Sequence, residues 1–180
     1  MRRGIIILLA ALLLVIGLQA ATLESLSLDD MIQKSTAIVR GRVTTSYATR
    51  LGSLIYTHYR VEVSDRWKGA EASVVDIVVP GGSLGALRQT FSGAPKLTPG
   101  ADYLLFLWRG PSGLNHIIGL SQGVFDVQLD ASGEAVAFRP ATSELMLDSA
   151  GQTVRDQAMR LRLKDFRARV TRTLTPGGTR

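Results

Sequence analysis

The chain contains no cysteine and only two histidines among its 180 residues. The absence of thiols excludes disulfide bonds, thiolate metal sites and cysteine nucleophiles. Neither histidine has a further metal-ligating side chain at a useful spacing, and no pair of carboxylates stands apart from the turn and surface acids. The sequence therefore predicts neither a metal site nor a bound cofactor. Hydrophobic residues make up 46% and charged residues 20% of the chain, which is typical of a globular protein.

Long apolar runs are absent beyond the N-terminus. Two N-terminal arginines precede an uncharged apolar run at residues 5–18, and the small residues Ala20 and Ala21 follow it. This layout is typical of a secretory signal peptide, with cleavage after Ala20. The run is shorter than the roughly 20 residues that span a bilayer, and an uncleaved N-terminal anchor is the alternative. We expect an exported, periplasmic or extracellular protein from which residues 1–20 are removed.

Positive charge is concentrated at the C-terminus. The formal net charge is +6, and the segment from Arg155 onward carries eight basic side chains against two acidic ones. Without the two N-terminal arginines, the rest of the chain is slightly acidic, which together with export argues against a nucleic-acid partner. The basic tail is suited to an acidic partner or to anionic lipid headgroups. The candidate contacts are Arg160, Arg162, Lys164, Arg167 and Arg169.

The clearest strand of the sequence occupies residues 55–69. Its odd positions are mostly apolar and its even positions polar, so one side of the strand is predicted to be buried and the other exposed. We expect Trp67 to continue the apolar register towards a Lys-Gly turn. Barrels present such polar faces to glycans or single-stranded nucleic acid. The candidate binding face comprises Tyr56, His58, Arg60 and Glu62, with Trp67 close by.

Further short strands surround this segment, with turn residues between them and no long helix. This pattern favours an all-β barrel or sandwich. Gly41 within a strand predicts a bulge or a sharp bend, as at a barrel corner. A short helix capped by Ser27 is predicted before the strands, and an amphipathic helix containing Phe166 and Val170 after them. The predicted strands are residues 37–45, 73–79, 103–108, 115–120, 124–130 and 134–139, and residues 124–130 are expected to place Phe125, Val127 and Leu129 inward.

Residues 81–85 read Gly-Gly-Ser-Leu-Gly and match the G-x-S-x-G pattern of a nucleophile elbow. Asp102 and His116 follow in the Ser–Asp–His order of that fold. The elbow requires a parallel sheet and a helix directly after Ser83, whereas residues 92–95 interrupt the chain soon afterwards and no βαβ pattern is present. A flexible glycine turn is favoured, and a serine hydrolase remains the alternative.

Three segments carry a family resemblance. They read TAIVRGRV at 36–43, YRVEV at 59–63 followed by WKG at 67–69, and PGADYLLF at 99–106. Their order resembles the netrin-like module, the OB-type barrel that also forms the inhibitory domain of tissue inhibitors of metalloproteinases. The chain also looks like exported bacterial proteins with the layout KG, PGG, FL and QG. The resemblance covers about residues 27–140 and implies the barrel. Those inhibitors chelate the protease zinc through an N-terminal cysteine, so none of their inhibitory residues can be assigned here.

These observations predict a mainly β protein. We expect an antiparallel OB-like, netrin-like barrel over residues 21–150, with a short N-terminal helix, and a basic C-terminal helix with a frayed tail over residues 151–180. The predicted function is a non-enzymatic binding module that recognises a protein or another component of the cell envelope. The alternatives are a cysteine-free peptidase inhibitor or protease-accessory protein, and a small serine hydrolase acting through Ser83.

Overall fold

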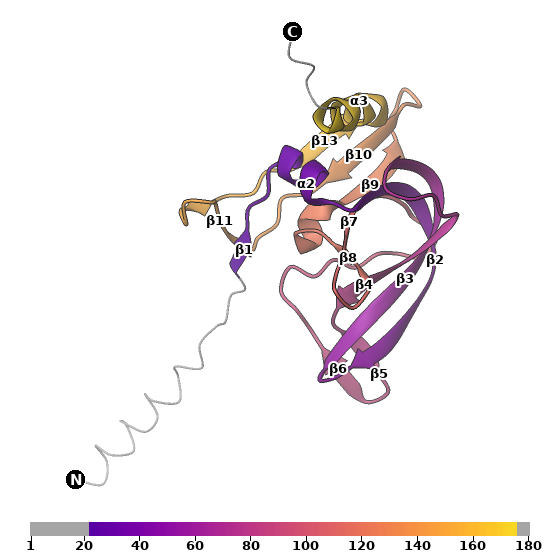
Figure 1. Cartoon of the computed structure of the whole chain (residues 1–180), viewed down its shortest axis with the longest axis vertical. Coiled ribbons are helices and arrows are strands. Elements are labelled where there is room, and N and C mark those ends of the chain that lie inside the picture. Colours follow the sequence, from indigo (N-terminus) through magenta and orange to yellow (C-terminus); the bar gives the residue numbers. More distant parts are fainter. Residues whose placement is uncertain (1–21, 176–180) are drawn as a thin grey trace, which may run out of the picture.

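The computed structural model describes residues 22–175, and the predicted signal peptide lies outside this range. The protein is mainly β, as the sequence predicts, with α2 (Leu28–Lys34) near the N-terminus and α3 (Leu163–Leu174) at the C-terminus (Figure 1). None of the described helices is long and apolar enough to span a membrane. The longer strands are β2 (Ala37–Leu51), β3 (Leu54–Lys68), β4 (Val74–Pro80), β7 (Asp102–Arg109), β9 (Val124–Leu129) and β10 (Ala135–Arg139). The shorter ones are β1 (Thr22–Glu24), β5 (Gly82–Leu84), β6 (Leu87–Gln89), β8 (Asn115–Ile117), β11 (Leu145–Leu147), β12 (Thr153–Val154) and β13 (Met159–Arg162).

Most of the strands belong to one sheet, in the order β13-β10-β9-β7-β2-β3-β4-β8. Neighbouring strands in it are antiparallel except β4 and β8, which are parallel. Strand β8 also pairs with the end of β7. The pairing therefore runs from β7 through β2, β3, β4 and β8 and returns to β7. The remaining strands form the smaller sheets β1-β11-β12 and β5-β6.

The N-terminal end of α2 is capped by its own sequence. The Ser27 hydroxyl accepts the backbone N–H of Asp30 at 3.1 Å, and the Asp30 carboxylate accepts the backbone N–H of Ser27 at 3.2 Å. This reciprocal pair is a capping box. Leu28, Met31 and Ile32 are buried on one side of the helix. The predicted helix therefore forms and turns its apolar side towards the sheet.

The β2–β3 hairpin is long and contains three register shifts. One lies beside Gly41, where a Cβ atom would come within 2.4 Å of the Glu62 carbonyl oxygen, so the predicted bulge is present. Further along β3, Trp67 packs against Phe166 at 5.8 Å between ring centroids, on the other side of the sheet from Val61. The prediction that Trp67 continues the apolar register is wrong, because each extra residue in a bulge shifts the alternation of sides.

Two apolar clusters lie on opposite sides of β7. Tyr103, Leu105 and Leu107 belong to the first cluster, together with side chains of β2, β3 and β4. Leu104 and Phe106 belong to the second, together with side chains of α2 and α3. Successive residues of a strand point to opposite sides. A strand that is buried on both sides must therefore be apolar throughout, which explains the uninterrupted apolar run of β7.

Two predicted strands end differently in the structure. Phe125 of β9 is fully buried, but Leu129 is 72% exposed rather than inward. Because β7 pairs only with residues 124–126 of β9, the β9–β10 hairpin projects beyond the core. Strand β8 stops at Ile117, since Gly119 and Leu120 have φ values of 59° and 55° that a strand does not accommodate. A short 3-10 helix, η1 (Leu120–Gly123), follows instead.

The C-terminal segment completes the second cluster. Strand β13 pairs antiparallel with β10, and α3 lies beside it and close to α2, far from the β5–β6 hairpin (Figure 1). Phe166 and Val170 of α3 are buried, and the Phe166 ring lies 5.0 Å from that of Phe125 and 5.8 Å from that of Phe106. The predicted amphipathic helix therefore forms, and its apolar side is part of the core.

Candidate functional site

The outer side of strands β2, β3, β4, β8 and β7 carries a group of aromatic rings. These side chains alternate with those of the first cluster and are aligned by the cross-strand register. Tyr47 lies opposite His58, and Trp108 lies opposite His116. Val78 of β4 is the register partner of both histidines and is buried. We call this surface the ring face; it comprises Tyr47, Tyr56, His58, Trp108 and His116.

His58 is held in place by a hydrogen-bond network. Its Nδ1 lies 3.0 Å from an Asp76 carboxylate oxygen, and its Nε2 lies 2.8 Å from the Thr49 hydroxyl. Tyr47 stacks on the imidazole with 4.6 Å between centroids and donates its hydroxyl to the same Asp76 oxygen at 3.0 Å. In the neutral ring, Nδ1–H donates to Asp76 and Nε2 accepts from Thr49. The His58 side chain is only 11% exposed, so it positions its neighbours more than it offers a contact surface.

The order hydroxyl, imidazole and carboxylate is also that of an activated nucleophile. Such a nucleophile needs nearby donors for the oxyanion, often at a helix N-terminus. The Thr49 hydroxyl is a secondary alcohol on a regular strand, and both described helices lie towards the other end of the molecule (Figure 1). The hydrogen bond to Asp76 raises the pKa of the Tyr47 phenol, which keeps it a donor. The network is therefore suited to fixing the ring face.

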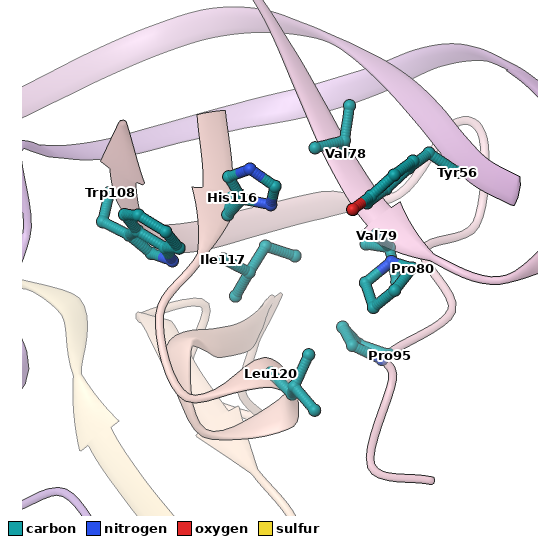
Figure 2. Close-up of a pocket in the computed structure, with 9 residues that line it drawn as sticks. All are labelled: Tyr56, Val78, Val79, Pro80, Pro95, Trp108, His116, Ile117 and Leu120. Atoms are coloured by element: carbon teal, nitrogen blue, oxygen red, sulfur yellow. The ribbon is translucent and has the colours of Figure 1, made fainter. Parts of the chain in front are cut away.

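A cavity of about 150 Å³ opens on the ring face. Figure 2 shows Tyr56 on one side of it and Trp108 with His116 on the other. The Trp108 and His116 rings are stacked with centroids 4.9 Å apart, and the Tyr56 ring meets His116 edge-on at 6.2 Å. Partial burial lowers the pKa of His116, so the imidazole is neutral at pH 7. We call this cavity the ring slot; its remaining lining residues are Val78, Val79, Pro80, Pro95, Ile117 and Leu120.

The polar atoms of the slot are free to bind a ligand. Within residues 22–175, no hydrogen bond uses the Tyr56 hydroxyl, the Trp108 indole N–H or either His116 nitrogen. An indole N–H can only donate, while a phenol and a neutral imidazole can donate or accept. No charged side chain lines the slot. The arrangement therefore suits an uncharged group that offers hydrogen-bond acceptors at the rim of an apolar pocket.

A second cavity of about 300 Å³ adjoins the ring slot. Trp108, Ile117 and Leu120 line both cavities. Leu26 and Lys34 contribute to the wall of the second one. Trp108 is 38% exposed, so its ring is accessible from solvent at this place.

The residues of the predicted binding face are only partly together. Tyr56 lines the ring slot, and His58 lies next to it in the hydrogen-bond network. Arg60 and Glu62 follow on the same side of β3 and are exposed. Trp67 lies at the far end of β3, where its ring packs against the second cluster and its indole N–H is already hydrogen bonded to a neighbouring carboxylate.

The sequence does not predict three of the residues that accompany Tyr56 on the ring face, namely Tyr47, Trp108 and His116. Tyr47 joins the site because it lies opposite His58 in the hairpin, and this pairing depends on the number of bulges in β2 and β3. Trp108 ends the apolar run of β7, where the strand reaches the surface. His116 follows a turn and was considered as a metal ligand or a catalytic base. Each signal becomes visible only once the strand pairing is known.

The serine-hydrolase residues lie in separate places. Ser83 is on β5 opposite Arg88 and lines a different cavity of about 410 Å³. Asp102 accepts two hydrogen bonds from Arg40, at 2.9 and 2.7 Å. His116 lies in the ring slot. Among the described residues no hydrogen bond joins the three, and the glycines before Ser83 lead into the β5–β6 hairpin rather than a helix.

The basic residues predicted to contact an anionic surface are mostly engaged within the protein. Four of the five form ion pairs with acidic residues: Arg162 and Lys164 with Glu134, Arg167 with Asp65, and Arg169 with Asp29. Within residues 22–175, Arg160 makes no ion pair. No group of three potential metal ligands gathers anywhere in this range.

Comparisons with known proteins identify no relative. No protein-family model matches the chain, and neither a curated protein nor a solved structure matches it. The functional argument therefore depends on the geometry of the ring face.

Proposed function

We propose that this protein is an exported, non-enzymatic binding module whose recognition surface is the ring face. The observation that carries the proposal is the ring slot, where Tyr56, Trp108 and His116 surround an open cavity with their polar groups free. Tyrosine and tryptophan are enriched at recognition surfaces because they combine a large apolar area with a polar tip. His58 and Asp76 support the slot by fixing the neighbouring strands.

The proposal includes an OB-like barrel of netrin-like type. Strands β2, β3, β4, β7 and β8 are in chain order the first to fifth strands of such a barrel. Three pairings support this assignment. They are β4 with β8 (third with fifth), β8 with β7 (fifth with fourth) and β7 with β2 (fourth with first). OB barrels bind ligands on the second and third strands and on the loop between the fourth and fifth. Tyr56 lies on the second strand, and Trp108 and His116 flank that loop.

Charge argues for a neutral ligand rather than a nucleic acid. No charged side chain lines the slot. Arg60 and Glu62 are both exposed on the same side of β3, so a phosphate would meet charges of both signs there, and most of the basic side chains of α3 are paired elsewhere. We therefore expect an oligonucleotide to bind less well than an uncharged ligand.

Export is tested by sequencing the N-terminus of the protein recovered from its own envelope or culture fluid. We expect the mature chain to begin at Ala21, because the small residues before it fit signal-peptide cleavage. Recovery of a chain that still contains the apolar segment, in the membrane fraction, would favour the N-terminal anchor instead.

Binding is tested by following the indole N–H signals of ¹⁵N-labelled mature protein. The probes are an oligoproline peptide, a neutral oligosaccharide and a single-stranded oligonucleotide. We expect at least one probe to shift the Trp108 signal while that of Trp67 stays unchanged, because Trp67 is packed in the second cluster. Followed by the backbone amide signals, Trp108→Ala should abolish saturable binding, and Leu129→Ala, on the distant β9–β10 hairpin, should not. The proposal is wrong if no probe affects Trp108.

The hydrolase alternative is tested with a serine-reactive fluorophosphonate. We expect no labelling, because neither Ser83 nor Thr49 has the helix N-terminus and base geometry of an elbow. Labelling that disappears in Ser83→Ala or Thr49→Val would make the protein an enzyme.

A further inference from the structure

We propose that the ligand of the ring face is a proline-rich segment in the polyproline II conformation, bound across Trp108. This inference rests on the proposed binding function and specifies its ligand class. It follows from the shape of the ring slot, from the hydrogen-bonding groups at its rim, and from the second depression beside it.

The slot has the shape of a pocket for one small, rigid apolar group. Tyr56 lies on one side of it and Trp108, stacked on His116, on the other, and the Tyr56 ring stands roughly perpendicular to that of His116 (Figure 2). Pro80, Pro95 and Leu120 also line it. Its volume of about 150 Å³ accommodates a single side chain and not a bulky ligand. A pyrrolidine ring packs well against aromatic side chains because it is compact and already ordered, so little entropy is lost on binding.

The hydrogen-bonding groups of the slot favour a ligand that mainly accepts. The Trp108 indole N–H can only donate, and the Tyr56 phenol is free to donate. A polyproline II segment has no internal hydrogen bonds, so its carbonyl oxygens are available, and its prolines have no N–H that would need an acceptor. A sugar offers a hydroxyl donor at almost every carbon, and the slot has only the Tyr56 oxygen and a neutral His116 nitrogen as side-chain acceptors for them.

The second cavity offers a further position for an apolar side chain of the same ligand. A polyproline II helix repeats every three residues, so its apolar side chains fall on one side at regular intervals. Trp108, Ile117 and Leu120 line both the ring slot and the cavity of about 300 Å³, so the two adjoin. One proline would occupy each cavity. No charged side chain lines the ring slot, and at the second cavity Lys34 is paired with Glu24. Both cavities therefore suit an uncharged segment.

The test titrates ¹⁵N-labelled mature protein with an oligoproline peptide, a glycine-serine peptide of equal length and a neutral oligosaccharide. We expect only oligoproline to shift the Trp108 indole signal saturably, with the Trp67 signal as an internal control. Trp108→Phe keeps an aromatic ring but removes the N–H donor, and should weaken binding about tenfold, measured from the backbone amide signals because the indole signal is lost. Tyr56→Phe should also weaken it, whereas Leu129→Ala, on the β9–β10 hairpin, should not.

The outcomes of this titration distinguish a failure of the polyproline ligand from a failure of the proposed binding function. Binding of the glycine-serine peptide as tight as that of oligoproline, or oligoproline binding unaffected by both Trp108→Phe and Tyr56→Phe, would overturn the inference. Binding of the oligosaccharide alone, dependent on Trp108, would overturn it as well but leave the ring face as a recognition surface. If neither these probes nor the oligonucleotide affect Trp108, both proposals fail.

Discussion

At the scale of single residues, alternation along a strand does not say which polar side chain faces solvent. Tyr56, His58 and Arg60 occupy equivalent polar positions on β3, yet their environments differ. Tyr56 lines the ring slot, His58 is covered by Tyr47, and Arg60 is exposed. The difference arises because the neighbouring strand contributes a large ring at one position and a smaller side chain at the next. A binding face therefore has to be assigned from cross-strand neighbours.

Gly41 occupies a position where the neighbouring backbone leaves no room for a side chain. A Cβ atom would lie 2.4 Å from the Glu62 carbonyl oxygen and 2.7 Å from a methyl group of Val61, and backbone cannot move aside cheaply. We expect Gly41→Ala to lower the free energy of unfolding by about 3 kcal/mol, at the upper end of overpacking effects. The measurement is urea denaturation.

Gly85→Ala is the matched control for this substitution. Gly85 has a positive φ of 58° but no neighbouring atom within 4 Å, so alanine meets only backbone strain of about 1 kcal/mol. Equal losses in the two variants would show that the close approach of β2 and β3 at Gly41 is unimportant.

A buried ion pair fixes the segment that leads into β13. Arg139 donates two hydrogen bonds to Asp156, at 2.7 and 2.8 Å, and their side chains are 5% and 8% exposed. Burial alone would raise the pKa of Asp156, but the hydrogen bonds from Arg139 and from the Thr142 N–H lower it below its usual value. This pair therefore stabilises the fold above the unfolded-state pKa of about 3.9, and the contribution is lost as the pH falls through the folded pKa.

We expect Asp156→Asn to lower the free energy of unfolding by about 3 kcal/mol at pH 7, because it leaves the Arg139 charge buried without a partner. The variant should also lose less stability than the wild type between about pH 4 and pH 2. Urea denaturation at a series of pH values measures both effects. Asp126→Asn is the control, and it should raise the free energy of unfolding at pH 7. Burial raises the pKa of Asp126, so its negative charge opposes folding at that pH. A wild-type acid profile in Asp156→Asn would contradict the assignment.

At the scale of elements, α3 is a structural part of the protein despite its basic composition. Its apolar side chains enter the second cluster, while its arginines pair with acids on α2 and β3. Truncation after Gly151 would therefore remove β13 and part of the core along with the positive charge. The role of the charge has to be tested with point substitutions that keep the helix.

The core contribution of α3 is tested with Phe166→Ala. Phe166 is fully buried against Trp67, Phe106 and Phe125. We expect a loss of about 3–5 kcal/mol in the free energy of unfolding, as is usual when a buried phenylalanine is truncated. Arg172→Ala on the exposed side of the same helix should change it by less than about 0.5 kcal/mol. A small effect of Phe166→Ala would mean that the helix is dispensable for the fold.

At the scale of the whole molecule, the basic tail and the slightly acidic body complement each other. Glu134, Asp65 and Asp29 pair with four of the five cations that the sequence offers to a membrane. Exposed ion pairs of this kind contribute little to stability, roughly 0–1 kcal/mol each. They nevertheless place acidic side chains between the cations, which reduces the attraction for an anionic surface.

We therefore expect the mature protein not to co-sediment with vesicles of phosphatidylcholine and phosphatidylserine at physiological salt. Vesicles of phosphatidylcholine alone serve as the control. This expectation would be contradicted by co-sedimentation that requires phosphatidylserine, decreases with added salt and is lost in the double variant Arg160→Ala/Lys164→Ala. Such co-sedimentation would restore the membrane-surface interpretation of the tail.

The candidate site was predictable only in part. Tyr56 and His58 could be singled out because the alternation of β3 is visible in the sequence. Trp108 and His116 could not, because they join Tyr56 through the pairing of β8 with both β4 and β7. Trp67 was assigned to the wrong side because bulges leave no unambiguous signal in a single sequence. The site lies on three strands that are distant in the chain, and no local pattern predicts how they pair.

Features that depend on near neighbours in the chain are predictable from the sequence. These are the Ser27 cap, the alternation along β3, the apolar run of β7 and the amphipathic α3, each governed by backbone geometry and side-chain spacing over a few residues. Long-range packing is needed to show that β7 separates two apolar clusters, that α3 belongs to the core, and that Tyr56, Trp108 and His116 form one slot. These features require the long-range pairing of strands, whose register depends on where the bulges fall.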